Sequence, residues 1–194
     1  RTRNDISLIL IAGDNGEELI APIRKMWGEH GLPPETLVST GWISDAQLVD
    51  LYKHAAVTLQ PSIMEGFGLT ALESWACGTP FLSAPGGAVA EVVGNDDYLF
   101  DPDVPPALSH LVGRCLNAPD FRDDLIAHGA ERLKEFGWDR TAAAALAAMH
   151  EKLSELGRSP TVEVHRSAAV PAERRLVMDV SSTAQSPVFS AIQR

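Results

Sequence analysis

The stretch "PSIMEGFGLTALESWACGTP", Pro61–Pro80, decides the expected fold because it joins a strand to a helix through a glycine-rich turn. The residues that lead into it, Ala55–Ser62, form a short apolar run rich in Val, Thr and Leu, which is typical of a buried strand. From Leu69 the apolar residues follow a helical spacing, and Gly78 and then Pro80 predict the end of the helix. The pattern therefore predicts a strand, a tight turn and a helix in direct succession.

The turn has the chemistry of an anion site. Gly66 and Gly68 let the backbone approach a ligand closely, and the first N–H groups of the following helix have no partner inside it. Such a helix end carries roughly half a positive charge and favours phosphate. Because Glu65 comes directly before the turn and Glu73 soon after it, the segment combines a phosphate-binding turn with two acidic side chains.

Composition argues against several classes of protein. The 194 residues suit one domain with appendages, and an apolar content of 45% is enough for a core. The net charge of −10, without a Lys/Arg cluster, argues against nucleic acid as a partner. No apolar run reaches the ~20 residues that span a bilayer, and the first run is too short for a signal peptide.

Cysteine and histidine usage predicts neither a metal site nor a cofactor. Cys77 and Cys115 stand far apart and fit no ligand spacing, which favours a reduced, cytoplasmic protein. The six histidines are scattered, and Asp101–Asp103 is interpreted as a turn after a short strand rather than as a metal motif.

Predicted strands and helices alternate along the chain. The predicted strands are Ile6–Gly13, Thr36–Trp42, Val57–Gln60, Pro80–Ala84 and Asp97–Pro102. The predicted helices are Glu17–His30, Ser44–Ala55 with a capping box of Ser44 and Gln47, Gly68–Cys77, Ala88–Gly94, and two or three helices from Pro105 to about Leu156, broken near Pro119 and Gly137. Repeated βα units predict an α/β fold with a Rossmann-like parallel sheet and helices on both faces. Ligands of such sheets bind outside the carboxyl ends of the strands, where the turn Glu65–Gly68 lies.

The chain changes character after Leu156. Residues 158–175 have two prolines and little periodicity, which is typical of a linker. Residues 176–194 begin with a strand-like run, Leu176–Val180, and continue into a Ser/Thr-rich loop and the beginning of a helix. We interpret residues 1–157 as one lobe, residues 176–194 as the start of a second α/β domain, and the chain as a piece of a longer protein.

The segment Gly41–Gly94 resembles the carboxyl-terminal, donor-binding lobe of a retaining glycosyltransferase of family 4 (group 1). The family pattern is E-x7-E, here Glu65 and Glu73, set in "PSIMEGFGL" and followed by "ACGTP", and the resemblance covers about residues 6–153. It implies one lobe of the two-lobed GT-B fold, with residues 1–157 binding the nucleotide sugar. The tail is similar to the opening of a second, tandem glycosyltransferase module.

The resemblance also implies roles for single residues. Glu65 is expected to be the catalytic residue that meets hydroxyl groups of the transferred sugar, and Glu73 to accept the two ribose hydroxyls. Four amides are expected to receive the phosphates and the sugar hydroxyls: those of Gly66, Phe67, Gly68 and Leu69. Two simpler interpretations stay open, namely that Glu65 is an acidic residue favoured near a helix start and that Glu73 is a solvated helix position.

The nucleobase pocket is expected at Trp42 and Ile43, although Trp42 fits a core position equally well. Asp45 fits either the edge of a guanine or, more commonly, the start of a helix. Gly86-Gly87 opens the loop after the next strand, and there Ala90 replaces the family's usual proline before Glu91, which changes the expected geometry.

The implied function is retaining transfer of a hexose from a nucleotide-diphosphate sugar to a glycan or lipid-linked acceptor, in surface polysaccharide or glycolipid assembly. The expected location is the cytoplasm, at the inner face of the membrane, with peripheral membrane association. One alternative is a related GT-B enzyme such as an epimerase or phosphorylase, and another is a non-catalytic nucleotide-sugar-binding module. Because the acceptor lobe and a basic diphosphate-binding turn are expected outside this chain, the piece alone is expected to be inactive.

A gap is expected in the sheet. In this fold the first strand of the lobe lies at the centre, between Ile6–Gly13 and Val57–Gln60, and the chain holds no such strand. Unpaired strand edges would make the lobe marginally stable or prone to aggregation. Leu176–Val180 has the character to fill the gap, and a linker of about twenty residues is long enough to reach it, although the tail fits a following domain better.

Overall fold

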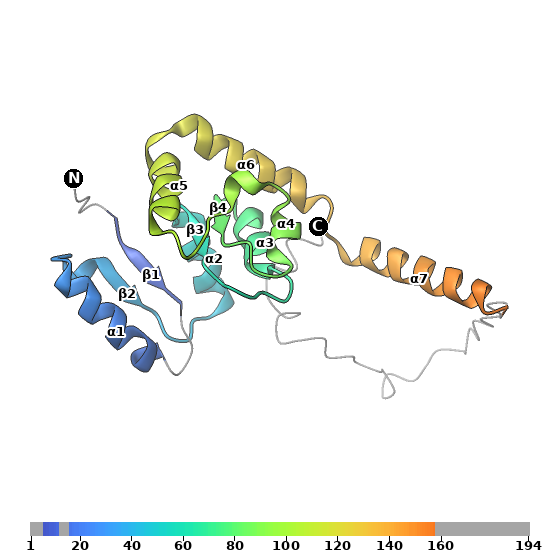
Figure 1. Cartoon of the computed structure of the whole chain (residues 1–194), viewed down its shortest axis with the longest axis horizontal. Coiled ribbons are helices and arrows are strands. Elements are labelled where there is room, and N and C mark those ends of the chain that lie inside the picture. The colour runs from blue at the N-terminus through green and yellow to red at the C-terminus, as the bar shows by residue number, and fades with distance from the viewer. Residues whose placement is uncertain (1–5, 12–15, 158–194) are drawn as a thin grey trace. The chain divides into compact units, whose positions relative to one another are not determined.

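The computed structural model describes residues 6–11 and 16–157 (Figure 1). Contacts divide the chain into two compact units, one that ends at Leu48 and one that begins at Val49. The strands are β1 (Leu8–Leu10), β2 (Leu37–Ser39), β3 (Thr58–Gln60) and β4 (Phe81–Ser83). The α-helices are α1 (Gly16–Glu29), α2 (Asp45–His54), α3 (Leu69–Ala76), α4 (Val89–Val93), α5 (Pro105–Asn117), α6 (Pro119–Leu133) and α7 (Trp138–Glu155), and the 3-10 helices are η1 (Pro34–Thr36) and η2 (Asp96–Tyr98).

The first unit contains one parallel strand pair covered by a helix. β1 runs beside β2 with Leu8 opposite Leu37, and α1 packs against β2. Ile20 of α1 and Leu37 of β2 are both buried, as expected for apolar residues where a helix covers a sheet. The predicted capping box at the start of α2 is confirmed, because Gln47 Oε1 accepts from the Ser44 N–H at 2.9 Å while Ser44 Oγ accepts from the Gln47 N–H.

The second unit contains the parallel pair β3–β4 with helices on both faces. Thr58 lies opposite Phe81, and neighbouring residues of β4 point to opposite faces. Phe81 joins an apolar cluster with residues of α3 and α4, whereas Leu82 joins one with residues of α5 and α6. Figure 1 shows β3 and β4 between α5 on one side and α3 with α4 on the other. This arrangement agrees with the predicted Rossmann-like α/β fold.

Helix α3 ends where the sequence predicts. Gly78 adopts φ +73°, a left-handed conformation that suits glycine, and the Thr79 N–H returns to the carbonyl of Ser74 at 3.0 Å. Pro80 then leads directly into β4. The "ACGTP" segment is therefore a helix stop followed by the next strand.

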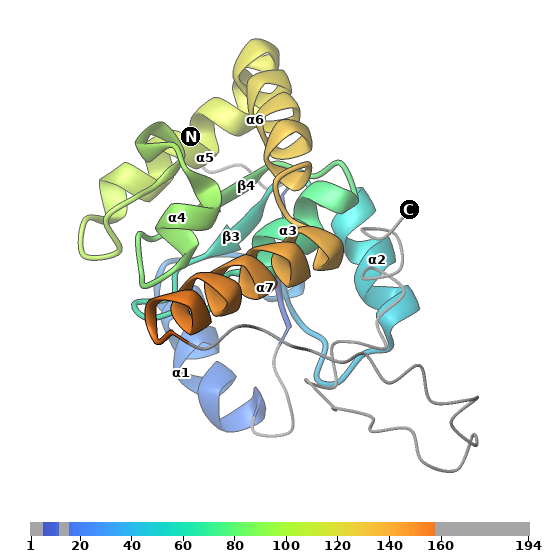
Figure 2. The ribbon, with the colours of Figure 1, turned by 90° about the vertical axis from the view of Figure 1, so that its right-hand side faces the viewer.

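Helix α6 packs closely on α3 (Figure 2). Trp75 of α3 is only 6% exposed, and its ring meets Phe81 edge-on at 6.0 Å between centroids. A Cβ atom at Gly129 of α6 would lie 2.2 Å from Trp75 Cδ1, far inside van der Waals contact. The two helices can therefore approach this closely because position 129 has no side chain.

The predicted strand Asp97–Pro102 is formed only in part. Its first two residues belong to η2, after which Leu99 makes a single parallel bridge to Ser83 and the Phe100 N–H donates to the Ser83 carbonyl at 2.9 Å. The side chain of Asn95 accepts a hydrogen bond from the Asp97 N–H at 3.0 Å, which starts a tight turn just where the apolar pattern suggested an extended chain.

The described strands form two separate parallel pairs, β1–β2 and β3–β4. The central strand predicted between them, and the resulting gap, stay predictions. Leu176–Val180 and the linker 158–175 lie outside the described residues. Among the helices that are described, none combines the length and the apolar character needed to cross a bilayer.

The contact between Trp75 and Gly129 predicts a substitution effect. Gly129→Ala should lower the free energy of unfolding by about 1–3 kcal/mol, because overpacking outweighs the gain in helix propensity of about 1 kcal/mol. Gly113→Ala in α5 is the matched control, since a Cβ there would meet nothing within 4 Å and should stabilise the helix. Urea unfolding of both variants checks this, and equal stability gains would contradict the close contact.

Candidate functional site

The candidate site is the loop from β3 to α3, at the carboxyl end of β3. Gly68 is the N-cap of α3, with φ +99° and no side-chain cap. A Cβ there would also lie 3.1 Å from Val89 Cγ2, so the backbone conformation requires glycine and the packing leaves little room for a side chain. The first N–H groups of α3 thus meet no capping side chain at position 68 and are oriented for an anionic ligand.

Gly86 and Gly87, which we call the diglycine turn, hold this loop in place. A Cβ at Gly86 would lie 2.3 Å from the carbonyl oxygen of Ser62, and one at Gly87 would lie 2.3 Å from that of Glu65. Gly87 also adopts φ +65°. The next residue, Ala88, donates its N–H to the Glu65 carbonyl at 3.1 Å. The diglycine turn therefore clamps the backbone on both sides of Ile63 and Met64.

The carboxylate of Glu65 is half-buried and receives a hydrogen bond on each oxygen. Gln60 Nε2 donates to Oε2 at 2.6 Å, and the Gly66 N–H donates to Oε1 at 3.2 Å. Neither donor comes from the first turn of α3, so these bonds differ from those of an acidic helix cap. In this structure the Gly66 amide is turned toward Glu65, and its predicted contact with phosphate stays a prediction.

The ring of Phe67 packs away from the turn. The ring meets Phe136, which follows α6, edge-on at 6.1 Å between centroids, and 46% of the residue remains exposed. The guanidinium of Arg132 lies 5.3 Å from the centre of the Phe136 ring. The side chain of Phe67 therefore anchors the loop to the end of α6, which leaves only its backbone for the predicted role.

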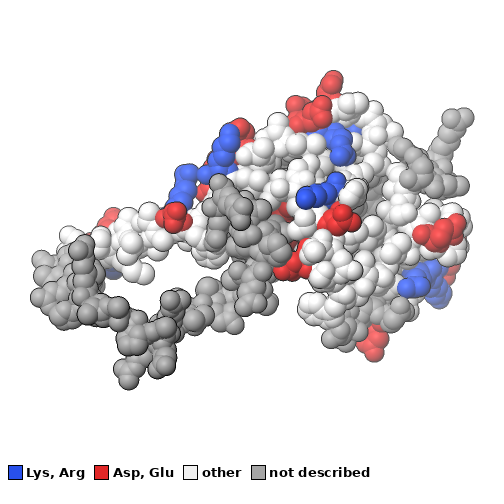
Figure 3. Space-filling view, turned by 180° about the vertical axis from the view of Figure 1, so that it is seen from behind, with Lys and Arg blue, Asp and Glu red and all other residues white. Residues whose placement is uncertain are grey.

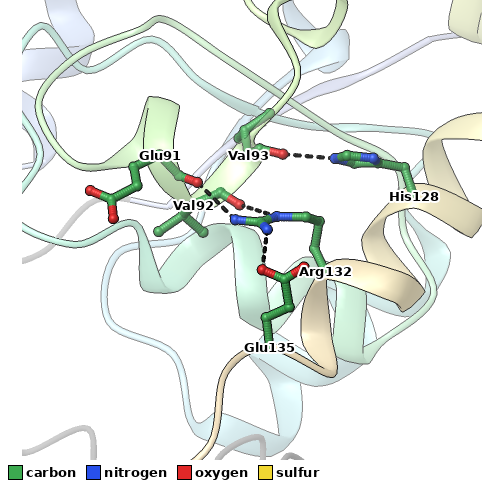
Figure 4. A network of polar contacts seen from close by, with 6 residues as sticks. All are labelled: Glu91, Val92, Val93, His128, Arg132 and Glu135. Atoms are coloured by element: carbon green, nitrogen blue, oxygen red, sulfur yellow. Dashed lines mark hydrogen bonds and ion pairs between the residues drawn. The ribbon is translucent and has the colours of Figure 1, made fainter. Parts of the chain in front are cut away.

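The carboxyl end of α4 is fixed by two side chains of α6 (Figure 4). Arg132 donates through Nε to the Val92 carbonyl at 2.9 Å and through Nη2 to the Glu91 carbonyl at 2.8 Å. His128 Nε2 lies 2.7 Å from the Val93 carbonyl oxygen. A cation at the negative end of a helix is favourable, and α4 begins directly after the diglycine turn. The side chain of Glu91 points away from the guanidinium, so the backbone makes these contacts.

Glu73 lies in the middle of α3 and is only 9% exposed, so the interpretation as a solvated helix position is wrong. The hydroxyl of Tyr52, from α2, donates to Glu73 Oε2 at 3.1 Å. Burial raises the pKa of the Tyr52 hydroxyl far above its ordinary value, and the charge and hydrogen bond of Glu73 raise it further. Tyr52 therefore stays protonated as a donor and holds the Glu73 carboxylate in place.

The predicted base-binding residues belong to the first unit. Trp42 is 76% exposed, which argues against a core position, and Ile43 is partly buried. Asp45 lies in the first turn of α2, as expected for an acidic residue at a helix start. Since the loop from Glu65 to Leu69 belongs to the second unit, the assignment of Trp42 and Ile43 to a base pocket stays a prediction.

Two side chains that contact the predicted carboxylates were not identified from the sequence, namely Tyr52 and Gln60. Tyr52 falls on the apolar face of α2, a position that by itself predicts core packing. Gln60 is a polar residue at the last position of a buried strand, next to the glycine-rich loop. This polar residue at the end of an apolar run could have indicated that Gln60 belongs to the candidate site.

Charged side chains are sparse on one face of the described surface, and the two cysteines are partly or fully buried. On the face drawn in Figure 3, Lys and Arg side chains stand singly or in small groups near Asp and Glu, and most of the described surface is uncharged. No cluster of potential metal ligands occurs among the described residues. Burial raises the pKa of the Cys77 and Cys115 thiols, which disfavours the nucleophilic thiolate at either position.

Comparison with known proteins adds a family and several relatives. A family profile described as "Glycosyl transferases group 1" matches residues 2–132. The chain is 31% identical over 157 residues to D-inositol 3-phosphate glycosyltransferase of Acidothermus cellulolyticus, which covers 79% of this chain and 35% of the relative. It is 33% identical to MMP alpha-(1->4)-mannosyltransferase of Mycolicibacterium hassiacum, covering 80% of this chain and 38% of the relative. For the serotype-specific mannosyltransferase WbdA of Escherichia coli the identity is 30%, over 66% of this chain and 16% of the relative.

Solved structures show the same fold. Sucrose-phosphate synthase of Thermosynechococcus elongatus matches with a TM-score of 0.63 and 26% identity, over 77% of this chain and 39% of that one. A glycosyltransferase of Rickettsia africae matches with a TM-score of 0.65 and 18% identity, over 77% of this chain and 40% of that one. These likenesses confirm the predicted fold class, a Rossmann-like α/β lobe of the GT-B type. The chain spans roughly a third of the first relative's length.

The diglycine turn predicts a contrast between two glycines of the site. Gly87→Ala should lower the free energy of unfolding by at least about 2 kcal/mol, because it adds both left-handed strain and a clash with the Glu65 carbonyl. Gly66→Ala is the control, since a Cβ there meets nothing within 4 Å, and it should change stability by less than about 0.5 kcal/mol. Thermal unfolding of the two variants measures this difference. A Gly87→Ala variant as stable as the unaltered protein would contradict the close contact between the diglycine turn and Glu65.

Proposed function

Because the chain belongs to the family described as glycosyl transferases group 1, we propose that it binds a nucleotide-diphosphate sugar for retaining transfer of the sugar to an acceptor. The observation that carries the proposal is the placement of Glu65 in the turn and Glu73 in the helix of one strand–turn–helix segment, each held by a hydrogen bond from a buried side chain. The diglycine turn and Tyr52 support that arrangement from outside the segment.

The proposed chemistry is loss of a diphosphate from the anomeric carbon. Negative charge develops on the departing phosphate and positive charge on the sugar. The amides at the start of α3, from Gly68 and Leu69, suit the phosphate because they carry partial positive charge without a titrating group. In the retaining route the leaving phosphate takes the proton of the acceptor on the same face. The residues of this chain therefore bind and orient the donor, and none acts as a nucleophile.

The two carboxylates have different proposed partners. Glu65 is partly exposed at the turn and would accept hydrogen bonds from hydroxyl groups of the transferred sugar. Glu73 would accept the two ribose hydroxyls, since a carboxylate can receive a diol on two oxygens. The hydroxyl of Tyr52 donates to Glu73 Oε2 and so orients this carboxylate.

The names of the relatives guide the substrate class. Two are called mannosyltransferases, and one of these is called serotype-specific. We therefore propose a hexose as the transferred sugar and a glycan or lipid-linked acceptor in surface polysaccharide assembly, at the cytoplasmic face of a membrane. The acceptor and the remainder of the active site are proposed to come from other parts of the full-length natural protein.

The experiment compares Glu73→Gln with Glu65→Gln in the full-length natural protein. Isothermal titration with UDP-glucose, GDP-mannose and ADP-glucose first identifies a donor. Glu73→Gln should weaken donor binding by ~1.5–3 kcal/mol, the range for a charge-assisted hydrogen bond. Glu65→Gln should leave the affinity for the plain nucleoside diphosphate unchanged and lower the rate of donor hydrolysis, because its partner is the sugar.

Tyr52→Phe is the control for packing around Glu73, since it removes only the hydroxyl that donates to this carboxylate. It should lower donor affinity less than Glu73→Gln does. Unchanged donor affinity of a folded Glu73→Gln variant would defeat the ribose assignment. Donor binding without any hydrolysis or transfer by the unaltered protein would instead favour a non-catalytic module.

A further inference from the structure

The side chain of Gln60 contacts Glu65, but the proposed chemistry gives Gln60 no part of its own. Gln60 is the last residue of β3 and is only 7% exposed, so it lies beneath the loop rather than at its surface. Its Nε2 atom lies 2.6 Å from Glu65 Oε2. We propose that Gln60 is a positioning residue, which fixes the Glu65 carboxylate in the orientation that meets the sugar of the donor. The inference rests on the proposed function of Glu65.

The orientation of the Gln60 amide follows from the charge of its neighbour. A carboxylate is an acceptor only, so the NH₂ group and not the carbonyl oxygen must face Oε2 at this distance. The carbonyl oxygen, Oε1, is then directed elsewhere, and it is buried without a hydrogen-bond partner among the described residues. The contact to Glu65 therefore leaves a buried carbonyl oxygen unsatisfied.

That arrangement is unfavourable for stability alone. A buried polar atom without a partner is destabilising, and an apolar side chain of the same shape would fill the position without that penalty. Local features that disfavour stability concentrate at functional sites. The charge-assisted bond to Glu65 is the feature that explains a glutamine at this position.

The second oxygen of Glu65 completes the geometry. The Gly66 N–H donates to Oε1, while the diglycine turn clamps the Glu65 carbonyl. The backbone of Glu65 and both of its carboxylate oxygens thus have fixed contacts, and Gln60 supplies the shortest of those to the carboxylate. Because Gln60 is buried below Glu65, it acts on the donor only through this carboxylate. A misplaced side chain at a reacting centre reduces turnover more than binding.

Ser83 offers a matched control on the neighbouring strand. It is the register partner of Gln60 across the β3–β4 pair, it is fully buried, and its Oγ also has no hydrogen-bond partner among the described residues. No hydrogen bond joins it to Glu65. Ser83→Ala therefore removes an unsatisfied buried atom next to Gln60 without touching the carboxylate.

The test uses Gln60→Met and Gln60→Glu in the full-length natural protein, with UDP-glucose and GDP-mannose titrated separately. Met keeps the length of the side chain without a donor, and Glu keeps its shape but turns an acceptor toward Oε2. Both should lower kcat for donor hydrolysis about tenfold to a hundredfold, the range for a misplaced catalytic group. KM, and the affinity for UDP or GDP, should change less than threefold, within about 0.7 kcal/mol at 1.4 kcal/mol per tenfold.

Thermal unfolding separates this role from a structural one. Gln60→Met should unfold at the same temperature as the unaltered protein or higher, although its kcat falls, and Ser83→Ala should keep both stability and kcat. Rates are expressed per molecule that binds UDP or GDP, so partial misfolding cannot imitate the effect. Wild-type kcat in both Gln60 variants, while Glu65→Gln loses activity, would overturn the positioning role alone. Full activity of Glu65→Gln would instead overturn the proposed function of Glu65, and with it this inference.

Discussion

The close backbone contact between the loop of residues 62–65 and the diglycine turn is the constraint on which the rest of the site depends. Two carbonyl oxygens, of Ser62 and Glu65, occupy the space where side chains at Gly86 and Gly87 would stand. Because the turn leads directly into α4, the loop that carries Glu65 is joined to the following βα unit as well as to its own strand and helix. A loop held from both sides can present a carboxylate in one orientation.

Helix α6 supports this arrangement from a distance. Gly129 lets α6 approach Trp75 of α3, while Arg132 and His128 bind the carbonyl groups at the end of α4. Phe136, just after the helix, meets the ring of Phe67 in the loop itself. One helix thus contacts both α3 and α4, the helices that follow the candidate loop and the diglycine turn.

Local patterns in the sequence are enough to predict most of the fold. The strand, turn and helix around Glu65 followed from apolar spacing and from glycines whose conformations the structure shows to be left-handed, as at Gly68 and Gly78. The strand predicted at Asp97–Pro102 is reduced to a single bridge for a local reason too, since a hydrogen bond to the side chain of Asn95 favours a turn at its start. Contacts between residues far apart in the sequence cannot be predicted from such local patterns. Tyr52 reaches Glu73 across 21 positions, and only folding brings these two side chains together.

We propose that the segment from Glu65 to Glu73 holds the sugar and the ribose of one donor molecule. The most direct measurement is a crystal structure of the full-length natural protein with a bound nucleotide-diphosphate sugar. We expect a sugar hydroxyl within hydrogen-bond distance of the Glu65 carboxylate, both ribose hydroxyls bound to Glu73, and Gln60 Nε2 still bound to Glu65 Oε2. A donor whose ribose lies away from Glu73, or whose sugar has no contact with Glu65, would contradict it.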